Sequence, residues 1–120
     1  MTQSVGIQDI PLLTAVTAAS GTGTSAPIRI QGREQLTIYF QSTGTTSGGT
    51  LLIEEAYYDG DKDPVYAGTW SQIASVAASS FTGTAQVAYH VAATRYKYVR
   101  VRISSDITGG GTVTVVACIG

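Results

Sequence analysis

Apolar and polar residues alternate with a period of two along much of this chain, and this pattern most constrains its fold. In the segment 95–104, apolar and cationic residues alternate, although imperfectly, and Val99, Val101 and Ile103 share one parity. Such alternation is typical of a strand with one buried face. The tyrosines of the segment fall on the opposite parity, so we expect a β-bulge near Tyr98–Val99.

Further segments carry strand patterns and are separated by turns rich in Gly, Ser, Thr and Asp. The segments are the β-leaning 12–19 and 26–31, 36–41, 51–58, 85–91 and 113–119, and we add a short strand within 65–76. We expect Ile28 and Ile30 to point inward and Arg29 outward, and Leu36, Ile38 and Phe40 to share one face. No helix of normal length is expected, and only residues 77–80 suggest a single helical turn. About eight short strands at this spacing predict an all-β fold, a jelly-roll-like antiparallel β-sandwich.

The length of 120 residues predicts one domain, which we place at 11–120 behind an N-terminal arm at 1–10. Pro11 argues against a central strand at this point. No apolar run approaches the ~20 residues of a membrane span, and the N-terminus lacks the pattern of a secretory signal. We therefore expect no membrane partner, and either synthesis in the cytoplasm or a processed fragment.

Composition narrows the class of function. Only 12% of the residues are charged and the net charge is -1, which disfavours a nucleic-acid partner. Cys118 is the single cysteine, so the chain has no internal disulfide framework. The surface is expected to be polar but weakly ionised.

The acidic residues Asp59, Asp61 and Asp63 begin like a calcium-binding loop, because oxygen ligands at alternate positions can converge on one cation. The sixth position is Pro64 where that loop needs Gly, and the twelfth is Trp70 where it needs Glu. An exposed acidic turn is therefore the preferred interpretation. The three aspartates remain weak metal candidates.

No catalytic constellation is visible. His90 is the single histidine and falls on the polar parity of its strand, and Cys118 has no second thiol beside it. The glycines at 109–111 lack the lysine and helix of a phosphate-binding loop. We therefore expect no enzyme activity and no cofactor. Trp70 and the seven tyrosines could form a sugar-binding platform, although such aromatic residues more often lie in a core or an interface.

Charges of opposite sign gather in different parts of the sequence. The interface candidates are the acidic Glu54, Glu55, Asp59, Asp61 and Asp63 and the basic Arg95, Lys97, Arg100 and Arg102. One interpretation is a cross-strand match within the chain or simply solvated faces. The other is complementarity between copies, in which the acidic turn of one subunit meets the basic strand of its neighbour. Interleaved cations and tyrosines at 95–98 also suit single-stranded nucleic acid, but the acidic cluster and the net charge count against it.

The chain resembles small virion proteins of tailed bacteriophages, especially capsid decoration (cement) proteins. The features that carry this resemblance are the N-terminal arm with Pro11, the Ser/Thr/Gly-rich loops, the strand 96–103 and the glycine hairpin with its Thr/Val strand at 109–116. The resemblance implies a non-enzymatic jelly roll that forms a homotrimer and clamps neighbouring capsid subunits from outside. It transfers no functional residue position by position.

We therefore expect a structural virion protein whose partners are the major capsid protein and its own copies. It would be made in the host cytoplasm and lie on the outer surface of the capsid. A place in a neck, tail or fibre is a related possibility. The alternative from another class is a carbohydrate-binding β-sandwich module that uses Trp70 and exposed tyrosines.

Overall fold

The computed structural model describes residues 8–18, 23–30, 35–57, 70–91 and 97–120. They form eight strands and one turn of 3₁₀ helix. The elements are β1 (Gln8–Val16), β2 (Ile28–Ile30), β3 (Leu36–Thr43), β4 (Gly48–Tyr57), β5 (Ser71–Ala77), η2 (Ala78–Phe81), β6 (Gln86–Val91), β7 (Lys97–Thr108) and β8 (Thr112–Ile119).

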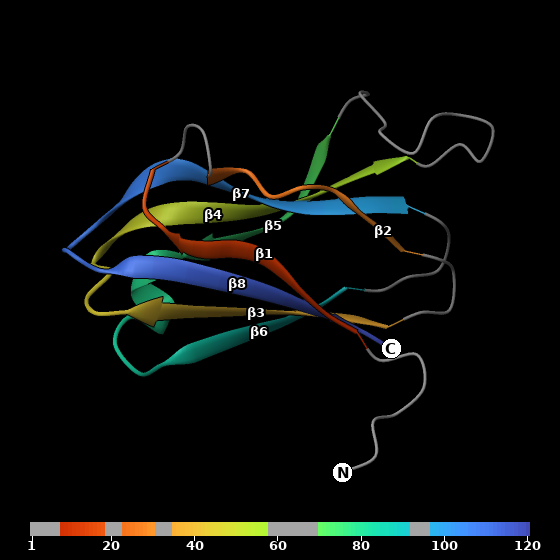
Figure 1. Ribbon diagram of the computed structural model, residues 1–120. Helices are drawn as coiled ribbons and strands as arrows, with labels where there is room; N and C mark the ends of the chain where they lie inside the picture. Colours follow the sequence, from red (N-terminus) through yellow and green to blue (C-terminus); the bar gives the residue numbers. More distant parts are fainter. Residues whose placement is uncertain (1–7, 19–22, 31–34, 58–69, 92–96) are drawn as a thin grey trace, which may run out of the picture.

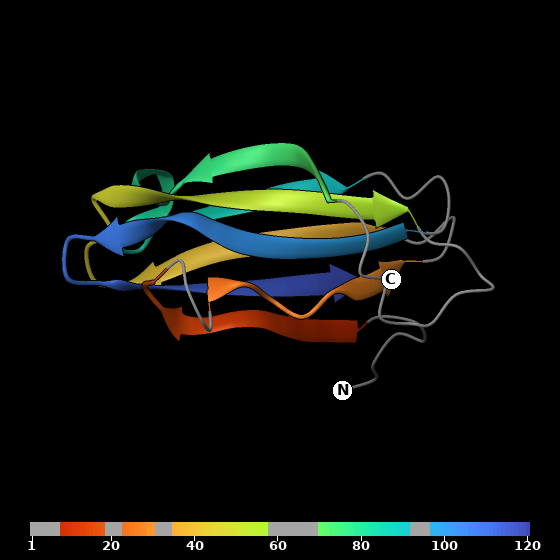
Figure 2. The same cartoon turned by 90° about the horizontal axis from the view of Figure 1, so that it is seen from above.

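The strands form two antiparallel sheets that face each other. The first sheet has the order β1-β8-β3-β6, seen from top to bottom in Figure 1. The second has the order β2-β7-β4-β5, and Figure 2 looks onto its outer face. The pairs β1–β8, β2–β7, β3–β6 and β4–β5 are nested, as in one long hairpin that is wrapped into a sandwich. This is jelly-roll topology, and it confirms the predicted all-β fold class.

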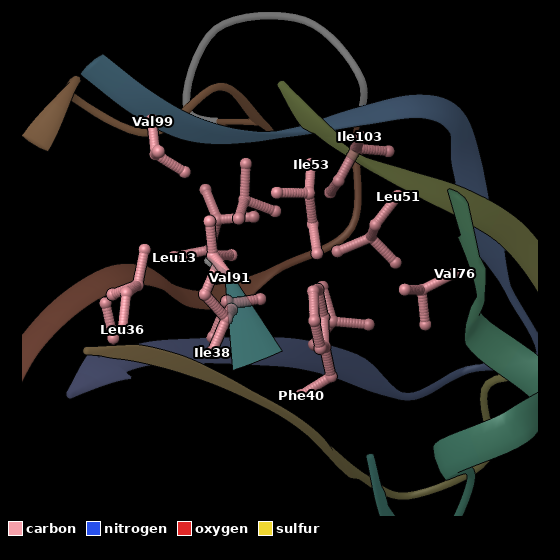
Figure 3. Close-up of a cluster of buried hydrophobic side chains, with 14 of the residues drawn as sticks. Leu13, Leu36, Ile38, Phe40, Leu51, Ile53, Val76, Val91, Val99 and Ile103 are labelled. Carbon is pink, nitrogen blue, oxygen red and sulfur yellow. The ribbon is translucent and has the colours of Figure 1, made fainter. Parts of the chain in front are cut away.

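The core lies between the sheets and is filled by alternate residues of each strand (Figure 3). Leu36, Ile38 and Phe40 of β3 are buried, whereas the residues between them lie on the outer face. On the opposite sheet, Leu51 and Ile53 of β4 point toward them. Each large aliphatic side chain contributes about 1.5–3 kcal/mol when it is removed from water. Burial of these alternate side chains therefore holds the two sheets together.

The expected bulge at Tyr98–Val99 is not present. The pairing of β7 with β4 runs without a register shift from Ile103 to Lys97. Tyr98 instead lies on the outer face of the second sheet, opposite Ala56, and both are buried there. Tyr98 and Val99 are therefore both buried although they point to opposite faces of the sheet. Two consecutive apolar residues had suggested a bulge in the sequence, but no bulge is needed to bury both.

The N-terminal boundary also differs from the prediction. β1 begins at Gln8, so residues 8–10 of the predicted arm belong to the first sheet, and residues 1–7 lie outside the described part. Pro11 lies in β1, an edge strand, where a missing N–H is tolerated. The helical turn expected at 77–80 is the 3₁₀ turn η2, one residue further along.

Candidate functional site

Charged side chains gather on the outer face of the second sheet, where β4 and β7 pair. Glu54 lies opposite Arg100, and Leu52 lies opposite Arg102. Glu54 Oε1 accepts hydrogen bonds from Arg100 Nε at 2.8 Å and Arg102 Nε at 3.2 Å, while Oε2 accepts one from Arg102 Nη2 at 3.1 Å. The Glu54 side chain is only 7% exposed, so both arginines hold a carboxylate that is largely removed from water.

The arginines keep this carboxylate ionised. Burial by itself raises the pKa of Glu54, but the hydrogen bonds from Arg102 and Arg100 and their positive charges outweigh burial, so the pKa lies below its usual value. The hydrogen bond to Glu54 in turn raises the pKa of Arg102. Glu54 and Arg102 are therefore both charged at neutral pH.

Two further contacts involve the same pair of strands. On the opposite, inward parity of β4 and β7, Lys97 Nζ donates to Glu55 Oε1 at 2.8 Å. The guanidinium carbon of Arg100 lies 4.2 Å from the centre of the Trp70 ring, which is a cation–π distance. We call Glu54, Glu55, Lys97, Arg100 and Arg102 the charged cluster.

The charged cluster contains five of the predicted interface residues and pairs them within one chain. This arrangement corresponds to the cross-strand match that the sequence left open. The remaining candidates Asp59, Asp61, Asp63 and Arg95 lie outside the described residues, so contact between copies through them stays a prediction. The part of the chain that the structure describes contains no group of three His, Cys, Asp or Glu able to hold a metal ion.

His90 and Cys118 lie on the outer face of the first sheet, on the same row as Thr37 and Asp9. His90 is exposed, and its Nδ1 lies 3.0 Å from the Thr37 hydroxyl. Burial raises the pKa of the Cys118 thiol, and a hydrogen bond and the negative charge of Asp9 add to the effect. A raised pKa favours the thiol over the nucleophilic thiolate.

The aromatic side chains that the structure describes do not share one surface. Trp70 is half-buried on the second sheet with Arg100 over its ring, and Tyr98 is buried. Tyr39 lies on the outer face of the first sheet, whereas Tyr89 packs against the core. They do not make the coplanar row that the carbohydrate-binding alternative requires.

The outer face of the first sheet, here the neutral face, is the feature that the sequence reasoning missed. One row across it is Pro11, Val116, Tyr39 and Ala88, and its neighbours include Thr114, Gln41 and Gln86. Among the described charged residues only Asp9 belongs to the first sheet; Arg29, Asp106 and the charged cluster all belong to β2, β4 and β7. The outward parities of 37–41, 86–90 and 112–118 carried this signal, because they contain no Lys, Arg, Asp or Glu.

Comparisons with known protein families, with curated proteins and with solved structures found no match. None of the described helices is long and apolar enough to cross a membrane. The function must therefore be argued from the two sheet faces themselves.

Proposed function

We propose that this chain is a structural virion protein of a tailed bacteriophage, of the capsid decoration type, that attaches to the shell through its neutral face. The observation that carries the proposal is the separation of charge between the two sheets. One outer face holds Thr, Val, Tyr, Ala and Pro with a single carboxylate among its described residues. The other holds the ion pairs of Glu54 with Arg100 and Arg102, which are already satisfied within the chain.

A neutral sheet face suits attachment by surface contact. Among its described charged groups only the Asp9 carboxylate would meet a docked partner, and the backbone groups of its inner strands are already paired in the sheet. Each contact is modest, but many copies on a symmetric shell act together, and linked weak sites gain by avidity. Jelly rolls serve in viral capsids and in lectins, which supports the proposal by analogy of fold alone.

The partners in this proposal are the major capsid protein and further copies of the chain, with the outer capsid surface as the location. The homotrimer implied by the resemblance is one way in which copies could assemble. A position in a neck, tail or fibre would use the same neutral face against a different neighbour.

A binding experiment with matched variants tests the proposal. The probe is the expanded, undecorated head of the phage that encodes the chain, and binding is measured by co-sedimentation. Val116 is half-buried at the middle of the neutral face, and Ser104 is exposed on β7 of the other sheet. Val116→Lys should weaken binding by at least about tenfold, because it forces a charge into the contact, and Ser104→Lys should leave it unchanged.

The binding results distinguish failure of the proposed function from attachment through another face. Absence of saturable binding by the unmodified chain would remove the proposed function. Equal weakening by both variants would show that attachment does not use the neutral face. Circular dichroism of each variant establishes that it is folded before binding is measured.

A further inference from the structure

Four of the described strands lie at sheet edges, and three of these carry features that disfavour pairing with another strand. β1 contains Pro11, two register shifts against β8, and Ala15 with a φ of 52°. β2 has three residues, with the exposed cation Arg29 at its centre. β5 has a register shift against β4 next to Glu54. Proline, bulges, charges and short strands are how natural sheets protect their edges.

β6 has none of these features. It pairs with β3 through six consecutive residues without a shift, and it contains no proline and no Lys, Arg, Asp or Glu. Among the described strands β3 is its only partner, and β6 is the outermost strand of its sheet in Figure 1. Its N–H and C=O groups on the outer side form a regular, uncharged edge of the kind to which a further strand can be added.

We propose that β6 is a self-association edge, at which β6 of a second copy pairs antiparallel about a two-fold axis through Ala88. This register places Gln86 opposite His90 of the second copy, and Val87 opposite Tyr89 of the second copy. Residues directly opposite in an antiparallel pair lie on the same face of the sheet. Both faces of the first sheet therefore continue across the joint.

The second copy is favoured as the occupant because β6 complements itself. On the inner parity, Val87 and Tyr89 are half-buried and pack against the edge of the core, so each would gain an apolar partner. On the outer parity, Gln86, Ala88 and His90 are exposed. No like-charged pair of Lys, Arg, Asp or Glu opposes the approach, since the strand has none.

Pairing at this edge would join two first sheets into one continuous sheet with the order β1-β8-β3-β6-β6-β3-β8-β1. The neutral face would double in extent. The proposal is independent of the virion role, because it concerns the contact between copies and not attachment to a shell. A two-fold contact predicts dimers, whereas the homotrimer implied by the resemblance needs a different, head-to-tail contact.

The test measures mass in solution. Light scattering of the unmodified chain from micromolar to millimolar concentration should show a monomer–dimer equilibrium. Ala88→Lys places two ammonium groups face to face at the axis and should raise the dimer dissociation constant by at least about tenfold. Ser75→Lys is the matched control, since Ser75 is an exposed small residue on β5, another edge strand, and this change should leave the constant unaltered.

Two measurements protect the test against a variant that fails to fold. Hydrogen exchange of the unmodified chain should show amides of 86–91 that become protected as concentration rises. In a Cys118→Ser background, Ala88→Cys should form a covalent dimer on oxidation and Ser75→Cys should not, because directly opposed strand residues lie within disulfide reach.

Each contrary result overturns the proposal. A monomer at every concentration would show that the β6 edge does not pair with a second copy. A trimer would require a head-to-tail contact. A dimer that Ala88→Lys leaves intact, or equal cross-linking at positions 75 and 88, would place the contact elsewhere.

Discussion

At the scale of single residues, Glu54 is the most constrained charged group that the structure describes. Removing a carboxylate from water is costly, and its three hydrogen bonds from Arg100 and Arg102 offset that cost. Loss of the carboxylate charge would leave two arginines facing each other across its position. Glu54, Arg100 and Arg102 therefore act as a unit.

We expect Glu54→Gln to lower the free energy of unfolding by about 2 kcal/mol at neutral pH, because hydrogen bonds to charged groups contribute about 1.5–3 kcal/mol. Since the pKa of Glu54 is lowered in the folded chain, its contribution is complete above the ordinary glutamate pKa of about 4.3. It is lost as the pH falls through the lower folded value. Urea unfolding between neutral and acidic pH measures the difference, which should shrink on acidification.

Glu55→Gln is the matched control. Glu55 makes one ion pair, with Lys97, and its side chain is 34% exposed. Exposed pairs contribute little, so we expect a loss of less than about 1 kcal/mol. An equal loss from both variants would contradict the role given to burial and to the two arginines.

At the scale of elements, the start of β4 requires a glycine. Gly49 has a φ of +113°, and a Cβ at this position would lie 2.8 Å from Ile107 Cα and 2.6 Å from Ile107 Cδ1. The register of β4 against β7 shifts at this point, between Gly48 and Leu51. The absence of a side chain therefore allows the two strands to approach.

Gly49→Ala should destabilise the chain by about 3 kcal/mol, since strained backbone and overpacking each cost about 1–3 kcal/mol. Gly83 also has a positive φ, of +70°, but no atom lies within 4 Å of the position its Cβ would take. Gly83→Ala should therefore cost only about 1 kcal/mol, the backbone penalty alone. Thermal unfolding followed by circular dichroism compares the two, and similar losses would show that contact with Ile107 is unimportant.

At the scale of the whole molecule, the two outer faces differ in chemistry. The outer face of the second sheet carries Glu54, Arg100 and Arg102, whereas the neutral face has Asp9 as its one charged residue among those described. Two modes of attachment would therefore respond differently to salt, because ions screen contacts between charges and leave apolar contacts largely intact.

If the neutral face binds the shell, affinity for undecorated heads should stay within about threefold between about 0.01 and about 1 M salt, although the Debye length falls from about 30 to about 3 Å. Co-sedimentation across this range measures it. A steep loss of affinity with salt would indicate that the charged cluster makes the contact.

Local pattern was sufficient to predict the sandwich. Side chains alternate across any extended strand, so the parity of Leu36, Ile38 and Phe40 identified the core face before any pairing was known. The same argument placed Ile28 and Ile30 inward and Arg29 outward. The helical turn after β5 was also visible, but the ends of β1 and β5 were not.

Long-range pairing established what parity alone could not. Glu54 and Arg100 are 46 positions apart, and only the register of β4 against β7 makes them neighbours. The same register buries Tyr98 on the outer face of the second sheet. The order of strands in the first sheet leaves β6 at an edge and gathers the neutral residues of β3, β6 and β8 on one surface. The direction of a side chain is a property of its own strand, and so it can be inferred from nearby residues. The identity of its neighbours depends on which strands pair and in what register, and these emerge only when the whole chain is folded.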